Sequence, residues 1–295
     1  MKIFVNERRT TVPGGAKVAE LVKKRKPEAD LCVLNGFPCL LEHTLEPDDR
    51  LVLIKKGSRP SAKELEHLMV ARHTPGVHAK LKKACVGIAG CGGLGSTAAM
   101  ALARAGIGKL VIADFDVVEP SNLNRQQYFV SQIGQPKVRA LAQNIRKANP
   151  FVRIEAHYRR VAAENVRSLF GKCQVIVEAF DRADQKEMLA EAVLSGLPGI
   201  PLILGNGMAG WGGNNLLRTR QLGSLHICGD ESTEAGPGRG LMAPRVGAAA
   251  CLQANQALEI LLGPDPAIGQ IAERGEDLPP RLPYLSRKPR KPRRA

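Results

Sequence analysis

A glycine-rich turn is the strongest chemical pattern in this sequence. Gly90, Gly92 and Gly95 lie in the segment GCGGLGS and match the spacing G-x-G-x-x-G. An apolar run at 84–89 precedes them and small, apolar residues follow at 97–105, which predicts a buried strand, a tight turn and a helix. Such glycines let the backbone approach a phosphate, and free N–H groups of the helix stabilise its charge. The pattern indicates a nucleotide, but this motif alone leaves a strand–helix turn without a ligand as an alternative.

Polar residues follow the next expected strand. The apolar segment 109–114 ends in Asp114, about 20 residues after the glycines, where a dinucleotide fold has a ribose-binding carboxylate. The sequence SNLNRQ at 121–126 then supplies amides and an arginine, and GQPK at 134–137 begins a helix with Lys137 near its positive end. A nicotinamide-dependent dehydrogenase would use the same glycines and Asp114, but it has no need for these two polar segments.

Five ordered motifs together resemble the ThiF/MoeB family of adenylating enzymes, relatives of the ubiquitin-activating enzymes. They are the glycine turn, DFD at 114–116, SNLNRQ, GQPK and the later acid Asp181. The match covers about residues 72–262 and is closest to ThiF, which adenylates the C-terminal glycine of the sulfur carrier ThiS during formation of the thiamine thiazole ring. The resemblance therefore implies an adenylyltransferase that uses ATP and Mg²⁺ and releases pyrophosphate.

The resemblance also implies a role for each residue of the site. ATP is expected over the glycine turn, with Asp114 on the ribose hydroxyls. Arg125 and Lys137 are the expected catalytic cations, and Asp181 is the expected magnesium ligand. The side-chain amides of Asn122 and Gln126 would orient the phosphates. The full set of expected nucleotide-binding residues is Gly90, Gly92, Gly93, Leu94, Gly95, Asp114, Asp116, Asn122 and Gln126. A carboxylate is already an anion at neutral pH, so no catalytic base is expected.

Arg72 and Cys228 have two interpretations each, and Asp184 has one. Arg72 lies where the family carries an arginine that reaches ATP phosphates across a dimer interface, but a surface arginine that ends a helix explains it equally well. Cys228 lies in the region where ThiF has a cysteine implicated in sulfur handling. Its position is several residues early, so a structural thiol at a strand end is an equal alternative to a nucleophile. Asp184 is interpreted as a helix N-cap.

The charge composition indicates which kinds of partner the protein could bind. The 295 residues include 43 Lys and Arg against 28 Asp and Glu, and the net charge of +15 makes nucleic acid a candidate partner. Much of this charge lies in a Pro/Arg-rich tail at 266–295. Such a segment has little to bury, so we expect it to be disordered and favour a solvated tail over an RNA contact.

The seven cysteines are scattered and include no C-x-x-C pair, whereas the family's usual structural zinc site uses two such pairs. We therefore expect no structural zinc. Scattered, odd-numbered thiols indicate a reducing compartment, and neither a run of about 20 apolar residues nor a signal peptide occurs. These features favour a cytoplasmic protein.

The element pattern predicts an α/β fold: a Rossmann-like, mostly parallel sheet with helices on both faces, and a small N-terminal α+β (β-grasp) domain. Expected strands alternate with expected helices, the strands at 152–156, 175–179 and 201–204 and the helices near 136–148, 162–169 and 184–195. Beyond them we expect strands at 214–219 and 223–228, a mobile loop at 229–240 and a helix at 248–262.

Residues 1–57 resemble the β-grasp fold of ThiS itself, with two strands, a helix and two more strands. A capping box at 61–64 predicts a helix inside a linker at 58–83, and the adenylation domain follows at 84–265. Gly57 is single and is followed by more chain, whereas a working carrier needs a free C-terminal glycine. We expect a retained structural or docking module, with proteolytic release after Gly57 as the rival.

The expected substrate is therefore a separate ThiS-like carrier protein ending in Gly-Gly, and the expected assembly is a homodimer with no membrane contact. A relative that adenylates a group on tRNA would use the same site and would explain the basic tail. A carrier for molybdopterin rather than thiamine is also left open. A dehydrogenase and a non-enzymatic carrier-binding module are less favoured, because the acidic and basic site residues are all present.

Overall fold

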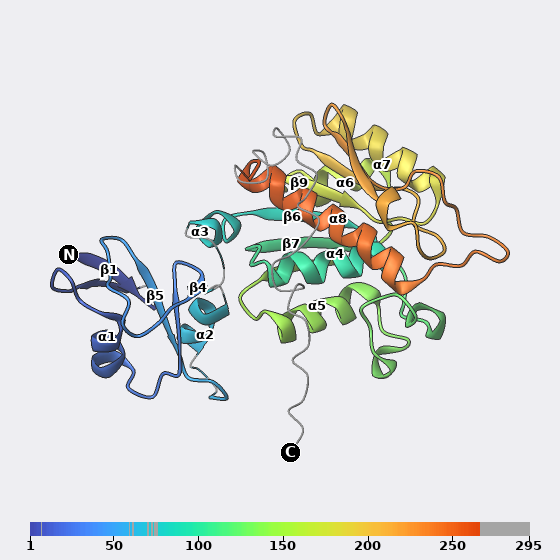
Figure 1. The fold of residues 1–295 in the computed structure, drawn as a ribbon. Coiled ribbons are helices and arrows are strands. Elements are labelled where there is room, and N and C mark those ends of the chain that lie inside the picture. The colour runs from blue at the N-terminus through green and yellow to red at the C-terminus, as the bar shows by residue number, and fades with distance from the viewer. Residues whose placement is uncertain are drawn as a thin grey trace, which may run out of the picture.

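The computed structural model describes residues 1–265 apart from residues 7, 59, 61, 70, 72, 74 and 75. The chain forms a small sheet near its N-terminus and a larger sheet covered by helices (Figure 1). The tail at 266–295, Arg72 and the expected capping residue Ser61 lie outside the described residues. The expectations for them stay predictions.

The small sheet has five strands in the order β2-β1-β5-β3-β4. Its elements and the helix packed on it are β1 (Lys2–Val5), β2 (Arg8–Thr11), α1 (Val18–Arg25), β3 (Leu31–Leu34), β4 (Phe37–Pro38) and β5 (Arg50–Ile54). β1 and β5 pair in parallel, whereas the β1–β2 and β3–β5 pairs are antiparallel. Val18, Leu21 and Val22 recur on one face of α1 and are buried against this sheet. The expected α+β domain is confirmed, and β4 is an addition.

Two short helices connect the sheets. They are α2 (Ala62–Met69) and α3 (Val77–Leu81). Leu68 of α2 packs against Val33 and Val52 of the small sheet. Glu66 of the same helix forms an ion pair of 2.5 Å with Lys82, which follows α3. α2 therefore contacts both the small sheet and the segment that leads into the large one.

The large sheet has seven strands in the order β11-β12-β10-β9-β6-β7-β8. They are β6 (Cys85–Ala89), β7 (Lys109–Asp114), β8 (Arg153–Tyr158), β9 (Val175–Glu178), β10 (Leu202–Gly205), β11 (Arg218–Leu222) and β12 (Leu225–Gly229). All neighbouring pairs are parallel except the hairpin β11–β12. The chain builds the sheet outward from β6 to β8, then returns to place β9 on the other side of β6. Doubly wound folds bind ligands at such a reversal of strand order.

Helices cover both faces of the large sheet (Figure 1). They are α4 (Gly93–Arg104), α5 (Lys137–Ala148), α6 (Ala163–Phe170), α7 (Ala183–Gly196) and α8 (Ala243–Leu262). α4, α5 and α8 cover one face, over Val86, Ile88 and Leu110, and α6 and α7 cover the other, over Val111 and Ala113. Burial on both faces explains why the strands are continuous apolar runs. The expected Rossmann-like sheet is confirmed.

Two expected elements have different bounds. The strand expected at 214–219 is wrong, because Asn214–Leu216 form a 3-10 helix and β11 begins only at Arg218. Gly212 and Gly213 have φ values of 70° and 58° and turn the chain before extended backbone begins. α8 begins earlier than expected, because Pro244 fits the first helical turn, where its missing N–H has no cost.

Asp184 is not an N-cap, which corrects our interpretation. The N-cap of α7 is Arg182, and Asp184 lies within the first turn. Its carboxylate accepts two hydrogen bonds from the Arg182 guanidinium, from Nε at 3.0 Å and from Nη2 at 2.8 Å.

Among the described residues, no helix combines the length and apolar character needed to cross a membrane.

Candidate active site

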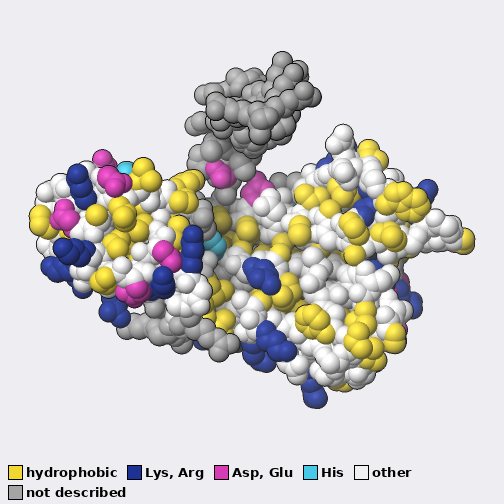
Figure 2. Space-filling view, turned by 60° about the horizontal axis from the view of Figure 1, so that its bottom comes forward, with side chains coloured by type: hydrophobic (Ala, Val, Ile, Leu, Met, Phe, Trp, Pro, Cys, Tyr) yellow, Lys and Arg dark blue, Asp and Glu magenta, His cyan; other side chains and the backbone are white. Residues whose placement is uncertain are grey.

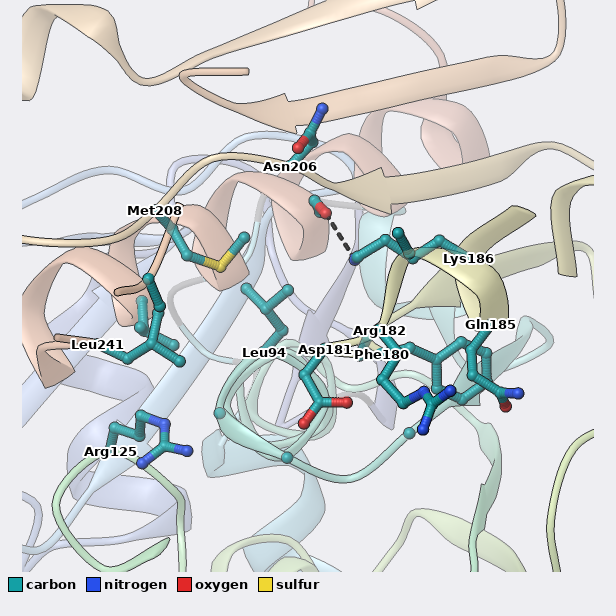
Figure 3. A pocket seen from close by; sticks show the side chains of 18 of the residues that line it. Leu94, Arg125, Phe180, Asp181, Arg182, Gln185, Lys186, Asn206, Met208 and Leu241 are labelled. Carbon is teal, nitrogen blue, oxygen red and sulfur yellow. Dashed lines mark hydrogen bonds between the residues drawn. The ribbon is translucent and has the colours of Figure 1, made fainter. Parts of the chain in front are cut away.

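A cavity of about 740 Å³ opens at the carboxyl ends of β6, β7, β9 and β10. Its walls come from the glycine turn after β6, from Asp114–Asp116 after β7, from Ala179–Ala183 after β9 and from Gly205–Ala209 after β10. Figure 3 shows the labelled side chains around this space. The cavity lies where the strand order reverses, so topology and surface shape indicate the same ligand site.

Close backbone packing explains the glycine turn. A Cβ atom at Gly95 would lie 1.9 Å from the Gly90 carbonyl oxygen, and one at Gly90 would lie 2.7 Å from the Ala179 carbonyl oxygen. At Gly92 the nearest atom to such a Cβ is Gln126 Nε2, at 3.9 Å, so the backbone borders open space. The turn residues that line the cavity are Gly90, Gly92, Gly93 and Leu94. The N-terminus of α4 is therefore accessible to an anion.

Asp114 fixes the glycine turn to the end of β7. Its Oδ2 accepts the Cys91 backbone N–H at 2.6 Å, and its Oδ1 accepts the Asp116 backbone N–H at 2.7 Å. Burial raises the pKa of Asp114, while these hydrogen bonds and Lys137 oppose the rise. Each carboxylate oxygen has a further lone pair, so Asp114, which lines the cavity, keeps acceptor capacity for a ligand hydroxyl.

Lys137 presents a buried ammonium group to the cavity. Its Nζ donates to Asp116 Oδ2 at 2.8 Å, and its backbone N–H donates to the Asp116 carbonyl at 2.9 Å. The lysine side chain is 8% exposed, whereas the Asp116 side chain is 48% exposed. Lys137 is also the first residue of α5, where the helix dipole favours anions. Two features therefore make this corner attractive to a phosphate.

Arg125 lies at the edge of the cavity (Figure 3). Its Nη1 donates to Asn124 Oδ1 at 2.8 Å and to the Ser121 carbonyl at 3.2 Å. These two bonds use one guanidinium nitrogen. Nη2 has no hydrogen-bond partner within the described part of the chain, so this nitrogen can still donate to a ligand.

The two amides of the polar loop occupy different places. Asn122 Oδ1 accepts the Glu119 backbone N–H at 3.0 Å, and the Asn122 carbonyl accepts those of Arg125 and Gln126. Asn122 does not line the cavity and instead holds this loop in shape. Gln126 does line it, and its buried Oε1 has no hydrogen-bond partner among the described residues. A buried acceptor without a donor is costly, so this atom points to a missing ligand group.

Asp181 follows β9, and its carboxylate extends into the cavity beside Arg182 (Figure 3). Among the described residues, no group of three or more His, Cys, Asp or Glu side chains could hold a metal ion. Mg²⁺ in nucleotide sites commonly binds one or two carboxylates together with substrate phosphates. Asp181 therefore fits magnesium in combination with a nucleotide. The expected absence of structural zinc stays a prediction.

An ion pair at the wall of the cavity was missed by the sequence analysis, and its lysine, Lys186, lines the cavity. Lys186 Nζ contacts both carboxylate oxygens of the fully buried Glu178 at 2.9 Å. The same ammonium donates to the Gly205 carbonyl at 2.8 Å, which joins the ends of β9 and β10 (Figure 3). Burial raises the pKa of Glu178, and Lys186 opposes the rise. The signal that could have revealed the pair is an acid ending the apolar strand VIVE.

A second buried ion pair was missed in the segment 206–241, which contains β11 and β12 and borders the cavity. Asp230 contacts Nη2 of Arg245 in α8, and the Arg245 side chain is 6% exposed. Asp230 also accepts the backbone N–H groups of Ser232 and Thr233 at 2.8 and 2.7 Å. Arg245 donates to the Gly212 carbonyl. Arg245 thus ties Gly212, which precedes β11, and Asp230, which follows β12, to α8. The glycine-rich composition of this stretch gave no sign of the pair in the sequence.

Of the two interpretations of Cys228, the structure favours the structural thiol over the catalytic one. It is fully buried in β12 and packs in the main apolar core. Its Sγ lies 3.4 Å from Thr219 Oγ1, and burial raises the pKa of the thiol. A buried, protonated thiol is a poor nucleophile. Of the other expected catalytic residues, Arg125, Lys137 and Asp181 meet at the cavity, and Arg72 lies outside the described residues.

Family models match both parts of the chain. The model of the ThiF family matches residues 65–276, and the model of ThiS-like ubiquitin matches residues 1–57. The first match includes the large sheet and all the residues that line the cavity. The second contains the small sheet. Both matches agree with the resemblances found in the sequence.

Curated relatives carry the names of adenylating enzymes. The Escherichia coli protein named sulfur carrier protein ThiS adenylyltransferase is 31% identical over 201 residues, which is 65% of this chain and 78% of that protein. The Bacillus subtilis protein of the same name is 32% identical over 195 residues, 64% of this chain and 57% of that protein. The chain spans only 42% of the Anopheles gambiae protein named adenylyltransferase and sulfurtransferase MOCS3, at 32% identity over 62% of this chain.

Solved structures share the fold. The E. coli tRNA N6-threonylcarbamoyladenosine dehydratase TcdA, solved in complex with ATP, superposes with a TM-score of 0.61 at 20% identity, covering 74% of this chain and 100% of that one. E. coli MccB, also solved with ATP, gives a TM-score of 0.51 at 20% identity, covering 70% of this chain and 64% of that one. At these identities the likeness shows the fold alone.

Proposed function

Since the chain belongs to the ThiF family, we propose that it is an ATP-dependent adenylyltransferase that activates the C-terminal carboxylate of a ubiquitin-like sulfur carrier protein. One observation supports this most: Arg125, Lys137 and Asp181 meet the glycine turn at one cavity. The relatives named ThiS adenylyltransferase support the same chemistry, and thiamine thiazole formation is the pathway that we infer.

Several features of the cavity fit ATP. Open space beside Gly92 gives phosphates access to the N–H groups that begin α4. Asp114 keeps acceptor capacity at the end of β7, where a ribose hydroxyl would bind. Gln126 Oε1 lacks a donor that a hydroxyl group could supply. The nucleotide would therefore satisfy an acceptor that the described part of the chain leaves unpaired.

The proposed reaction needs positioning and charge stabilisation more than proton transfer. A carboxylate oxygen of the carrier attacks the α-phosphorus of ATP, a new P–O bond forms, and the bond to the β-phosphate bridging oxygen breaks. Pyrophosphate leaves with that electron pair, and the carrier becomes an acyl adenylate. Lys137 and Arg125 stabilise the charge that develops on the phosphate oxygens, where a preorganised cation is worth most. The anionic nucleophile requires no general base.

Magnesium would be held by Asp181 and by the phosphates of the nucleotide. When bound, the ion supplies charge neutralisation for the departing pyrophosphate. The role of the protein is to place the Asp181 carboxylate in the cavity without pairing it to a lysine or arginine in the described part of the chain. In the described part of the chain, Asp181 has no hydrogen bond or ion pair of its own, because Arg182 is paired with Asp184.

We further propose that the chain divides into a docking module at 1–57, a linker at 58–83, an adenylation domain at 84–265 and a solvated tail at 266–295. The protein would work in the cytoplasm as a homodimer, with Arg72 reaching the phosphates of the partner's site. Apolar side chains near the polar loop support such an interface, because Phe129, Val130 and Ile133 are exposed.

ATP–pyrophosphate exchange tests the proposal. We expect label from pyrophosphate to enter ATP only with magnesium and with a carrier that ends in Gly-Gly. The panel contains a thiamine-pathway carrier, a molybdopterin-pathway carrier and, as the matched control, each carrier without its last glycine. Exchange with the thiamine-pathway carrier alone supports the inferred pathway. Failure with every carrier, in protein that binds ATP, contradicts the proposal.

Adenylation of a group on tRNA is the second candidate. The net charge of +15 favours it, and acidic side chains are scarce on the face of the larger domain visible in Figure 2. Binding through phosphates weakens steeply as salt rises. Salt-sensitive tRNA binding together with tRNA-dependent pyrophosphate release would favour this candidate, and the absence of both would eliminate it.

A further inference from the structure

Two thiols lie in contact at the end of the large sheet opposite the cavity. Cys85 is the first residue of β6, and Cys173 lies just before the neighbouring strand β9. Their Sγ atoms are 3.7 Å apart, close enough for one thiol to donate to the other. A disulfide bond has an S–S distance of about 2.0 Å, so the two sulfur atoms would have to approach by about 1.7 Å to form one.

The backbone holds these two residues together. The Gln174 N–H donates to the Cys85 carbonyl at 2.9 Å, and the Cys85 N–H donates to Gln174 Oε1 at 2.9 Å. Gly87, two residues along β6, provides the room for the second thiol, because a Cβ atom there would lie 3.2 Å from Cys173 Sγ and 2.7 Å from the Phe170 ring. The contact therefore depends on fixed elements rather than on a loop.

The two thiols differ in accessibility and charge. Cys85 is partly exposed, whereas Cys173 is buried in the apolar layer beneath α6. The hydrogen bond with Cys173 and the nearby Lys109 lower the pKa of Cys85 to about 7, although burial and Glu155 oppose this. The same hydrogen bond and burial raise the pKa of Cys173. Cys85 is therefore the reactive member of the pair, and Cys173 is a protected thiol within its reach.

We propose that Cys85 and Cys173 form a site of reversible oxidation by hydroperoxides, which ends in an intrachain disulfide. The Cys85 thiolate attacks the peroxide, the O–O bond breaks, an S–O bond forms, and an alcohol or water leaves with a proton. Cys173 Sγ then attacks the sulfenic sulfur, the S–S bond forms and the S–O bond breaks. Water leaves with the Cys173 proton. Sulfur is oxidised and the peroxide is reduced, and a thiol reductant reverses the change.

The consequence of the disulfide is a covalent link between the amino ends of β6 and β9. The carboxyl ends of the same strands carry Gly90 and Asp181, which lie at the cavity. The link would constrain the unfolded chain over a long loop, so the oxidised protein should melt at a higher temperature than the reduced protein. This inference does not depend on the adenylation reaction.

Peptide mapping after peroxide treatment tests the proposal. Fully reduced protein is treated with hydrogen peroxide, free thiols are blocked, and proteolytic peptides are analysed by mass spectrometry without reductant. We expect two of the seven thiols to be lost, a mass decrease of about 2 Da for two hydrogens, and a peptide pair linked through Cys85 and Cys173. Dithiothreitol should restore both thiols.

Matched variants make the result decisive. Cys251→Ser removes an exposed thiol on α8 and should leave the linked peptides unchanged. Cys173→Ser removes the resolving thiol, so Cys85 should proceed to sulfinic acid. Cys85→Ser should leave Cys173 reduced, and its melting temperature should no longer rise on oxidation. Oxidation of Cys85 to sulfinic acid in the unaltered protein without a linked peptide, or links that form only between chains, would overturn the proposal.

Discussion

Single side chains decide the chemistry of this site, and their partners show what each one contributes. Lys137 is paired with Asp116, Arg125 is fixed by one of its nitrogens, and Asp181 extends into the cavity beside Arg182. These three residues could be predicted because they lie in short motifs with fixed spacing. Glu178 and Asp230 could not, because their partners Lys186 and Arg245 are brought near only by folding.

The first residue-scale prediction concerns the charged groups. Lys137→Ala and Arg125→Ala should each lower the ATP–pyrophosphate exchange rate by on the order of 10²-fold, because each removes a preorganised cation. Asp181→Ala should lower it through loss of the metal ligand. Lys147→Ala, an exposed lysine on the same helix as Lys137, is the matched control and should leave the rate unchanged. Full activity in Asp181→Ala would remove its proposed role.

The stability of the folded protein should depend on pH through the buried ion pair between Asp230 and Arg245. Burial acts against ionisation of Asp230, but hydrogen bonds from Thr233, Ser232 and Arg245 lower its pKa below the usual value. A carboxyl whose folded pKa is lowered adds stability above its unfolded pKa of about 3.9, and this stability is lost as pH falls below that value. Asp230→Asn should therefore cost about 3–5 kcal/mol at neutral pH.

Chemical denaturation at pH 7 and at pH 3 measures this effect. The difference in unfolding free energy between Asp230→Asn and the unaltered protein should shrink at the lower pH. Glu231→Gln, which removes an exposed ion pair with Arg220, is the control and should cost far less. An equal difference at both pH values would show that the Asp230 charge is not what stabilises the folded protein.

At the scale of elements, hydrophobic pattern predicted most of the fold. Continuous apolar strands such as 109–114 are recognisable because helices bury both of their faces. The pattern failed at 214–219, where the positive φ of Gly213 overrides strand propensity. The pattern also could not place the polar loop at 121–126 relative to the glycine turn. The two segments are joined by a hydrogen bond from the Gln127 backbone N–H to Ser96 Oγ, between residues about 30 positions apart in the sequence.

The element-scale prediction concerns the glycine turn. Gly95→Ala places a Cβ atom 1.9 Å from the Gly90 carbonyl oxygen, so the backbone of the turn must move. We expect a loss of about 1–3 kcal/mol or more in stability and loss of nucleotide binding, measured by thermal unfolding and by ATP titration. Gly196→Ala, at the end of α7 with nothing within 4 Å of the new atom, is the control and should have little effect on either.

At the scale of the whole molecule, one chain contains both an enzyme-like domain and a carrier-like domain. Gly57, the position of a carrier's terminal glycine, lies in a turn with φ of 73°. The Lys56 N–H donates to Asp30 Oδ1 at 2.8 Å, and Lys55 forms an ion pair with Asp30 at 3.0 Å. These contacts hold the end of the small domain against its own surface, which suits a retained module better than a free tail.

Intact mass spectrometry of protein from its native host tests this whole-molecule prediction. We expect a single species in which residues 1–57 are still joined to the rest. The rival outcome is a fragment that ends at Gly57 and that the remaining chain can charge with AMP. Such a fragment would show that this chain carries its own substrate, and the Gly57→Ala variant would then block the charging.

The proposed enzyme adenylates the terminal carboxylate of a separate carrier. Intact mass spectrometry of a Gly-Gly carrier, after incubation with the purified chain, ATP and magnesium, tests this activity most directly. We predict a carrier heavier by one AMP group, sensitive to hydroxylamine and absent when Lys137→Ala replaces the unaltered chain. A carrier of unchanged mass, with ATP bound and the chain folded, would contradict the account.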